Sequence, residues 1–372
     1  MNINTKPDIV TIVGNRPQFI KMGPISSEFS RRGYTEYIIH TGQHFDENMS
    51  GVFFQEMGLP KPNVFLDIHS AFHGAMTGEM LIKLEALLME LKPRGVLLYG
   101  DTNSTLAAAL AAVKLQIPIA HVEAGPRIYD MTTPEEINRL VADHASALRF
   151  CPDLQSVQNL AKEHITEGVH LTGDVMYDAF LSYSQKAKEH SSILQTLGLQ
   201  NEAFVLMTAH RPNNTNSKIG VDSLLSIIKR SPHKVVFPLH PRTKNAFKTF
   251  KLYDALREQE NAVITEALGY LDILMLVGAC KAVLTDSGGL QKEAFWAQKP
   301  VGILLFVSPW PQIEMCGWQK ICWKDGGIDI DQATHIVSDF QPVTPAPSLF
   351  GDGHAADHIV DILEQNKWFE TK

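Results

Sequence analysis

The sequence lacks the features that mark several large classes of protein. No apolar run approaches the roughly 20 residues that a membrane-spanning helix needs, and residues 1–8 are too short and polar to form a signal peptide. No block of Lys and Arg offers a basic face to nucleic acid or to an anionic membrane, and the net charge is -8. We therefore expect a cytoplasmic protein that binds neither nucleic acid nor a membrane.

Cysteine is also scarce, and neither a metal site nor a cofactor site is indicated. The chain has no Cys-x-x-Cys pair and no cysteine and histidine cluster at zinc spacing. It also lacks a Gly-x-Gly-x-x-Gly run, which usually marks a nicotinamide site. We expect reduced, structural thiols at all four cysteines, which are Cys151, Cys280, Cys316 and Cys322.

What is present is the composition of a globular protein that is large enough for two domains. The chain has 372 residues, of which 44% are hydrophobic and 20% are charged. Short apolar runs alternate with longer amphipathic stretches. In the first half, strands are expected at 9–13, 37–40, 96–99 and 117–122, and helices at 19–31, 105–114 and 134–147. In the second half, strands are expected at 203–207, 234–239, 262–264, 282–284 and 299–304.

Strands that are apolar on both faces and alternate with helices indicate parallel sheets covered by helices on each side. The sequence therefore predicts an α/β protein with two doubly wound, Rossmann-like domains and a cleft between them. We place the first domain at residues 1–172 and the second at 173–354. The C-terminal helix, 355–372, could return to either domain, and we assign it to the first.

Unusual polar residues follow directly after many of these strands. In open α/β sheets, ligands bind outside the carboxyl ends of the strands, so these residues are candidates for one site. They are Arg16, Gln43, His44, Asp101, Glu123, His210, His240 and Ser287.

One of these junctions predicts a phosphate site. After the strand at 282–284, the residues Ser287, Gly288 and Gly289 precede a helix. Glycines let backbone N–H groups approach an oxyanion, and the helix N-terminus adds unpaired donors. Glu293, further along the helix, could accept two hydrogen bonds from a ribose diol. The alternative is an ordinary N-cap followed by a solvated glutamate.

Each of the other clusters also has a purely structural alternative. Arg16 and Lys21 could be solvated cations rather than an anion site. Asp101 could cap the helix that follows it. Glu135 and Arg139 are spaced for a structural i,i+4 salt bridge. A structural role is harder to assign to Glu123, which lies in a glycine-containing loop after a strand.

Seven segments of the chain together resemble one known family, the non-hydrolysing UDP-N-acetylglucosamine 2-epimerases. The resemblance runs from about Ile9 to Glu364. It rests on GNRPQFIK, TGQHFDENMS, YGDTNSTLAAALAA, HVEAG, PEEINR, AHRPNN and TDSGGLQKEA. The first two segments look most like the branch that acts on UDP-2,3-diacetamido-2,3-dideoxy-glucuronate.

The resemblance implies a GT-B-like fold, often dimeric, and an enzyme that inverts C2 of a UDP-2-acetamido sugar for surface polysaccharide. A base would remove the C2 proton, UDP would leave C1 by anti elimination, and UDP would add back after reprotonation on the other face. Neither a metal nor a cofactor is implied.

Carried over by motif, the resemblance assigns three sets of residues. The acid/base set and its assistants are Asp101, Glu123, Glu135, Lys21, Arg139 and His210. The UDP-binding set is Arg16, Ser287, Gly288, Gly289 and Glu293. A possible second UDP-sugar site comprises Gln43, His44, Glu136, Arg211 and His240. A further basic contact of that second site, expected between Asp67 and His73, is absent.

The chain departs from the family pattern after the strand at 299–304. Residues 305–312 read LFVSPWPQ, where the family usually has an arginine and a glutamate, and AGPR replaces the usual AGLR. Fewer polar contacts should therefore face the sugar or the diphosphate. Three alternatives remain: a GT-B glycosyltransferase, a non-catalytic nucleotide-sugar binder and a hydrolysing relative.

Overall fold

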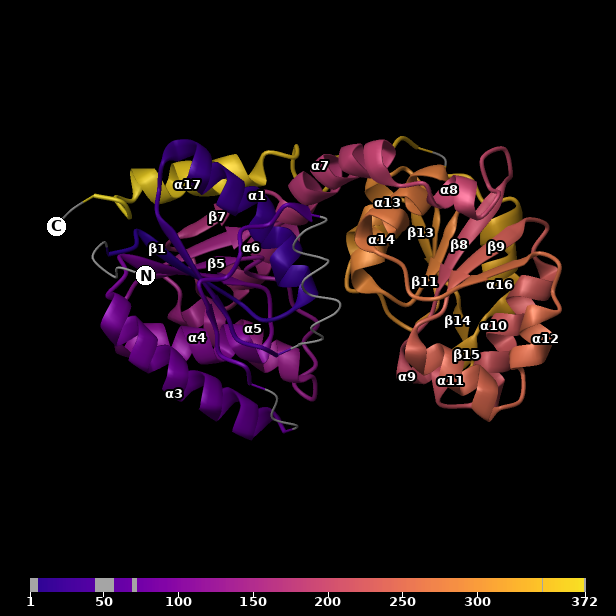
Figure 1. The fold of residues 1–372 in the computed structure, drawn as a ribbon, viewed down its shortest axis with the longest axis horizontal. Coiled ribbons are helices and arrows are strands. Elements are labelled where there is room, and N and C mark those ends of the chain that lie inside the picture. The colour runs from indigo at the N-terminus through magenta and orange to yellow at the C-terminus, as the bar shows by residue number, and fades with distance from the viewer. Residues whose placement is uncertain (1–5, 44–56, 69–71, 343, 371–372) are drawn as a thin grey trace. The chain divides into compact units, whose positions relative to one another are not determined.

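The computed structural model describes residues 6–43, 57–68, 72–342 and 344–370 (Figure 1). The chain divides into two compact units. The first unit comprises Met1–Leu181 and Phe350–Lys372, and the second comprises Ser182–Leu349. The division falls within helix α7 (Val175–His190), whereas the sequence placed it just before this helix.

The first unit is built on a seven-stranded sheet whose strand order is β3-β2-β1-β4-β5-β6-β7, with every pair parallel. The central strands are buried on both faces, as their unbroken apolar runs require. The strands are β1 (Ile9–Val13), β2 (Glu36–His40), β3 (Val64–Phe65), β4 (Gly95–Tyr99), β5 (Ile119–Val122), β6 (Leu148–Cys151) and β7 (Val169–Leu171). The helices that flank this sheet are α1 (Arg16–Arg32), α3 (His73–Leu91), α4 (Asn103–Lys114), α5 (Pro134–Ala145), α6 (Leu154–Lys162) and α17 (Ala355–Gln365).

Helix α1 begins at Arg16, three residues earlier than the sequence pattern predicted. The Asn15 side chain accepts a hydrogen bond of 3.2 Å from the Gln18 N–H, and Pro17 occupies the first turn. Both are favourable at a helix start, because Asn satisfies an orphan donor and Pro has none to satisfy. Arg16 therefore lies on the helix and not in a turn before it.

The C-terminal helix α17 packs on α1 of the first unit. Arg32 near the end of α1 forms ion pairs with Asp357 and Asp361, both at 2.6 Å, and with Glu364 at 3.1 Å. Tyr34 also donates a hydrogen bond of 2.8 Å to Glu364. These contacts join the two ends of the chain within one unit.

The second unit has a six-stranded parallel sheet in the order β10-β9-β8-β11-β12-β13 and a small antiparallel pair, β14-β15. Its strands are β8 (Phe204–Thr208), β9 (Lys234–Pro238), β10 (Ala262–Thr265), β11 (Val283–Thr285), β12 (Val301–Ile303), β13 (Gln319–Ile321), β14 (Trp323–Lys324) and β15 (Gly327–Ile328). Its helices are α8 (Ile193–Thr196), α9 (Pro212–Thr215), α10 (Lys218–Arg230), α11 (Pro241–Thr249), α12 (Tyr253–Arg257), α13 (Tyr270–Ala279), α14 (Gly288–Trp296), α15 (Pro311–Met315) and α16 (Ile330–Ser338).

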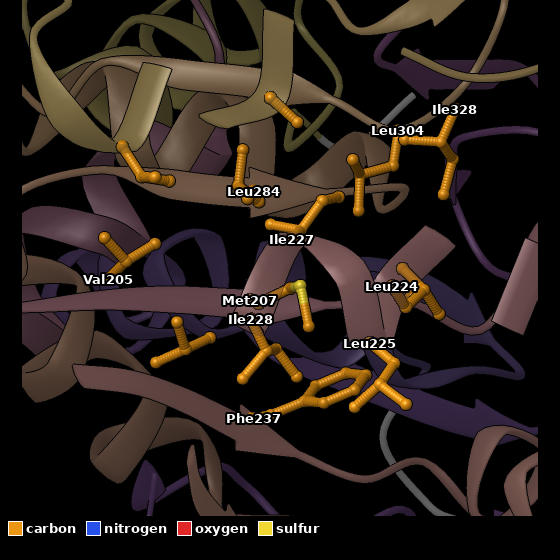
Figure 2. Packing of buried hydrophobic residues seen from close by; sticks show 14 of the residues in the cluster. Val205, Met207, Leu224, Leu225, Ile227, Ile228, Phe237, Leu284, Leu304 and Ile328 are labelled. Atoms are coloured by element: carbon orange, nitrogen blue, oxygen red, sulfur yellow. The ribbon is translucent and has the colours of Figure 1, made fainter. Parts of the chain in front are cut away.

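Figure 2 shows one core of this second unit, in which strand residues meet the apolar side of α10. Met207 of β8 and Phe237 of β9 are fully buried with Leu224 and Ile228 of α10. The two parallel sheets confirm the expected α/β, GT-B-like fold class. The sequence pattern missed the short strands β6 and β7, where Arg149 and His170 interrupt the apolar runs.

All four cysteines are free, and three of them are buried. Burial raises the pKa of the Cys280 and Cys322 thiols to about 12, so these thiols stay protonated and act as small apolar side chains. In the part of the chain that the structure describes, no helix combines the length and apolar character needed to cross a membrane.

Glu36, at the start of β2, makes the stability of the first unit dependent on pH. Its carboxylate accepts a hydrogen bond of 2.5 Å from Thr11, and burial raises its pKa from 4.5 to about 7. The folded state therefore favours the neutral carboxyl, and the free energy of unfolding should fall by up to roughly 3 kcal/mol as the pH rises from 4.5 to 7.

We expect Glu36→Gln to remove this loss, because the amide carries no charge. The variant should melt at a higher temperature than the wild type at pH 8, and the gain should shrink at pH 5. Thermal unfolding of both proteins at the two pH values measures the effect, with the exposed Glu260→Gln as the matched control. An equal difference at both pH values would contradict the assignment.

Candidate active site

In the first unit, the carboxyl ends of β1, β4 and β5 bring the predicted acidic residues to one edge of the sheet. The Lys21 ammonium, on α1, contacts the Glu123 carboxylate that follows β5, and both side chains are largely buried. A Cβ placed on Gly100 would lie 3.6 Å from Lys21 Nζ, so Lys21 also lies beside the turn that carries Asp101. The predicted cation and two predicted carboxylates are thus neighbours.

Asp101 does not cap α4, so the structural alternative considered for it is wrong. The N-cap is Thr102, which forms a capping box with Thr105. The Asp101 carboxylate contacts the Arg139 guanidinium instead, and Asn138 donates a hydrogen bond of 2.9 Å to the Asp101 carbonyl oxygen. Helix α5 therefore holds Asp101 at its side chain and at its backbone.

The acidic start of α5 divides into a buried and an exposed residue. Glu136 is 1% exposed, accepts hydrogen bonds from the Ile128 and Tyr129 N–H groups, and pairs with Arg139 at 2.9 Å. Glu135 is exposed, and the salt bridge expected between Glu135 and Arg139 is replaced by the pair with Glu136. Glu136 is thus engaged in fastening the 128–129 loop.

The Glu123 loop is conformationally constrained. Glu123 adopts a left-handed φ of 67°, which is uncommon for a residue with a side chain and costs on the order of 1–3 kcal/mol. Gly100 in the neighbouring turn has a φ of 58°, and Gly125 has one of 90°. Backbone strain of this kind is concentrated at functional sites, where the surrounding structure must hold it.

Two glutamines connect the strand ends, and the sequence analysis missed the first of them. Gln18 accepts a hydrogen bond of 2.7 Å from the Gly14 N–H and donates one of 2.7 Å to the Tyr99 carbonyl. Gln43 accepts hydrogen bonds from the backbone N–H of Ser104 at 3.0 Å and from its hydroxyl at 2.7 Å. Among the other predicted residues, Arg16 is exposed in the first turn of α1, and His44 lies outside the described residues.

In the second unit, the fully buried Asp286 connects the loops after β8 and β11, and the sequence analysis did not select it. Its carboxylate pairs with His210 Nδ1 at 3.0 Å. It also accepts hydrogen bonds of 2.8 Å from the His210 and Arg211 N–H groups and one of 2.9 Å from the Asn214 amide. Burial opposes its ionisation, but the bonds from His210 and its neighbours hold the pKa of Asp286 below its usual value. Its position directly before Ser287, at the end of a strand, could have identified Asp286 as a candidate site residue from the sequence.

The expected phosphate site follows Asp286 directly. Ser287 is the N-cap of α14, but its side chain makes no capping hydrogen bond. Gly288 and Gly289 occupy the first two helical positions, and a Cβ added to Gly289 would meet open space. Further along, Glu293 is 6% exposed and accepts a hydrogen bond of 2.8 Å from the Tyr270 hydroxyl. Glu293 is therefore not the solvated residue that the structural alternative required.

Residues 305–312, which depart from the family pattern, are fastened to α14. Trp310 Nε1 donates a hydrogen bond of 2.8 Å to the Gly288 carbonyl, and Lys292 Nζ lies 4.0 Å from the centroid of a Trp310 ring. The Ser308 hydroxyl donates to Gln291 at 2.7 Å. Phe306 and Val307 remain exposed. Of this segment, Pro309 and Trp310 thus lie beside Gly288.

The remaining predicted residues of the second unit gather at the ends of β8 and β9. The rings of His210 and His240 lie 5.4 Å apart, and His240 Nδ1 accepts a hydrogen bond of 3.2 Å from the Arg242 N–H. Burial, with the charges of His210 and Arg242, lowers the pKa of His240. Arg211 has an exposed side chain.

Comparison with known proteins identifies the family to which this chain belongs. The family model described as UDP-N-acetylglucosamine 2-epimerase matches residues 27–364. The chain belongs to the UDP-N-acetylglucosamine 2-epimerase family. This confirms the family expected from the sequence and, with it, the enzyme class.

Relatives of known name cover almost the whole chain. A UDP-N-acetylglucosamine 2-epimerase homolog of Methanococcus maripaludis is 41% identical over 357 residues, covering 95% of this chain and 99% of its own. The UDP-2,3-diacetamido-2,3-dideoxy-D-glucuronate 2-epimerase of Pseudomonas aeruginosa is 39% identical over 363 residues, with the same coverage. The Methanocaldococcus jannaschii UDP-GlcNAc 2-epimerase, solved in complex with UDP-GlcNAc and UDP, has a TM-score of 0.86 and 36% identity, covering 96% of this chain and 99% of that one.

Proposed function

We propose that this epimerase inverts C2 of a UDP-2-acetamido sugar by anti elimination and re-addition of UDP. The observation that carries the proposal is the buried contact between Lys21 and Glu123, next to the turn that carries Asp101, at one edge of the first sheet. A reaction that removes a proton from one face of a carbon and returns one to the other face needs two acid/base groups. Paired carboxylates beside a cation supply them.

Within this proposal the two units have different tasks. The carboxylates Asp101 and Glu123 exchange the C2 proton, Lys21 and Arg139 hold their charges, and Glu135 is a further candidate from the family motif. The backbone donors at Gly288 and Gly289 hold the diphosphate, which leaves C1 as UDP, and His210 assists beside them. Arg16 adds a cation for the diphosphate.

For the sugar, we propose UDP-GlcNAc or the 2,3-diacetamido glucuronate derivative as substrate, with surface polysaccharide synthesis as its use. The two candidate substrates are supported by similarity to enzymes with these names. The exposed apolar residues Phe306 and Val307 and the absence of a charged residue from 305–312 support a substrate that is held there by few polar contacts.

Incubation in D₂O tests the proposed function. The purified enzyme should place deuterium at C2 of the recovered UDP-sugar and form the C2 epimer from at least one of the two substrates. Tight UDP-sugar binding without exchange over hours would instead indicate a non-catalytic binder. Transfer of the sugar to an added acceptor without C2 exchange would indicate a glycosyltransferase.

The ribose contact gives a prediction of its own. We expect Glu293→Gln to weaken UDP binding about tenfold, because one of the two oxygens that accept from the ribose diol is replaced by an amide. Isothermal titration calorimetry with UDP measures the loss, with the exposed Glu258→Gln at the end of α12 in the same unit as a control if its melting temperature is unchanged. An unaltered UDP affinity would show that Glu293 does not bind the ribose.

We also propose that the enzyme is a homodimer that buries the outer side of α3. This helix exposes Ile82 (71%) and Met89 (59%), and Phe72 (79%) precedes it, while its opposite side packs on the core. Large apolar side chains spaced along one exposed helix face are typical of an interface. Ile82→Glu should convert the dimer to a monomer in light scattering, whereas the exposed Glu85→Gln should not; a wild-type monomer would contradict the proposal.

A further inference from the structure

A buried histidine that the proposed mechanism does not use lies between the two carboxylate loops. His121 is on β5, two residues before Glu123, and is fully buried. Its Nε2 lies 2.7 Å from the carbonyl oxygen of Gly100, the residue before Asp101. Its Nδ1 lies 2.7 Å from Oδ1 of Asp143 on α5. One ring therefore contacts the Asp101 turn on one side and α5 on the other.

Asp143 extends the contact to the other loop. Its second oxygen, Oδ2, accepts a hydrogen bond of 3.2 Å from the Gly125 N–H and pairs with Arg127 at 2.7 Å. Both belong to the loop that carries Glu123 in its left-handed conformation. The pair His121–Asp143 thus holds the Asp101 turn through Gly100 and the Glu123 loop through Gly125.

The hydrogen-bond partners decide the protonation of the ring. A backbone carbonyl oxygen only accepts, so Nε2 must carry a proton, and an ionised carboxylate also only accepts, so Nδ1 must carry one too. We propose that His121 is an imidazolium ion and that the His121–Asp143 ion pair is the positioning element for Asp101 and Glu123. The part of this inference that concerns catalysis rests on the proposed function.

The groups around the pair support an ionised Asp143. Arg127 pairs with Asp143 and also with Glu163 at 2.7 Å, and Arg149 of β6 donates to the Asp143 carbonyl oxygen. Burial raises the pKa of Asp143, but His121 and Arg127 more than offset it, so that its pKa lies below the usual value. Two cationic partners and a backbone donor thus engage both oxygens of this buried carboxylate, and these contacts favour its ionised form.

Nitrogen-15 NMR of the unliganded wild-type enzyme, labelled at histidine, tests the charge without any activity. The His121 ring should show two protonated nitrogens, because losing either proton breaks a buried hydrogen bond. His121→Gln identifies the resonance by its disappearance. A singly protonated ring for the resonance that His121→Gln removes would overturn the proposal, and this outcome does not depend on the reaction catalysed.

Kinetics test the positioning role. His121→Gln and Asp143→Asn should each lower kcat about a hundredfold, the loss expected from a displacement of about 1 Å at the reacting groups, with KM changed less than threefold. UDP affinity should not change, because four of the five predicted UDP residues lie in the second unit and the fifth, Arg16, lies on α1 and not in either carboxylate loop. The matched control is His170→Gln on β7 of the same sheet, which should keep wild-type kcat.

The outcomes of these experiments separate the positioning role from a purely structural role and from the proposed function. A wild-type kcat in folded His121→Gln overturns the positioning role, as does a parallel loss in the His170→Gln control. If His121→Gln does not fold, the kinetics of Asp143→Asn test the positioning role, and the wild-type NMR spectrum tests the charge. A wild-type enzyme without C2 exchange would defeat the proposed function alone, and the NMR result would still decide the charge of His121.

Discussion

Glu123→Gln is expected to slow C2 exchange at least a thousandfold. The amide cannot accept the C2 proton, and general acid/base groups of this kind contribute roughly 10²–10⁴ to a rate. The change also removes the anionic partner of the buried Lys21 ammonium. Deuterium incorporation at C2 in D₂O measures the rate, and calorimetry should show an unchanged affinity for UDP.

The control for Glu123→Gln is the same change at Glu189, which is exposed at the end of α7 and should leave the rate unaltered. Lys21→Met supplies a second comparison. If the ion pair itself carries the effect, Lys21→Met should reduce exchange by a similar factor. A rate within tenfold of the wild type for Glu123→Gln would remove Glu123 from the proton transfer.

Asp286→Asn is expected to have the second large effect, on stability as well as on rate. Asp286 is fully buried and accepts from two backbone N–H groups, the Asn214 amide and His210. In Asp286→Asn, an amide nitrogen that is itself a donor would face the N–H groups that the carboxylate now accepts from. The change also breaks the buried charge pair with His210, which should lower the free energy of unfolding by roughly 3–5 kcal/mol. The variant should lose UDP affinity because the glycine-containing turn follows Asp286 directly.

The pH dependence of the wild type gives an independent check on Asp286. Its pKa is lowered by folding, so its contribution to stability is present above the usual pKa of an aspartate and is lost as the pH falls below it. Thermal unfolding of Asp286→Asn should therefore differ less from the wild type at low pH than at pH 7. The exposed Asp222→Asn on α10 is the matched control, and an equally large loss there would contradict the argument.

Sequence patterns predicted the fold well wherever a strand is buried on both faces. The predicted run 9–13 is β1 (Ile9–Val13), and the run at 96–99 differs from β4 by a single residue. Such strands can be recognised in the sequence because burial on both faces requires an unbroken run of apolar side chains. The pattern failed for β6 and β7, because Arg149 and His170 interrupt their apolar runs. It placed the start of α1 too late, because the apolar pattern begins at Phe19 whereas the Asn15 cap and Pro17 start the helix at Arg16.

By itself, the sequence determined the family, the alternation of strands and helices, and the junctions where functional residues lie, because these depend on periodicity and on short motifs. Only the tertiary structure decided which residues meet: Arg139 contacts Asp101 and Glu136, not Glu135. It also selected Asp286, and it showed His121 and Asp143 between the two carboxylate loops. Hydrogen-bond partners distant in sequence are set by how strands and helices pack, and no local pattern records that packing.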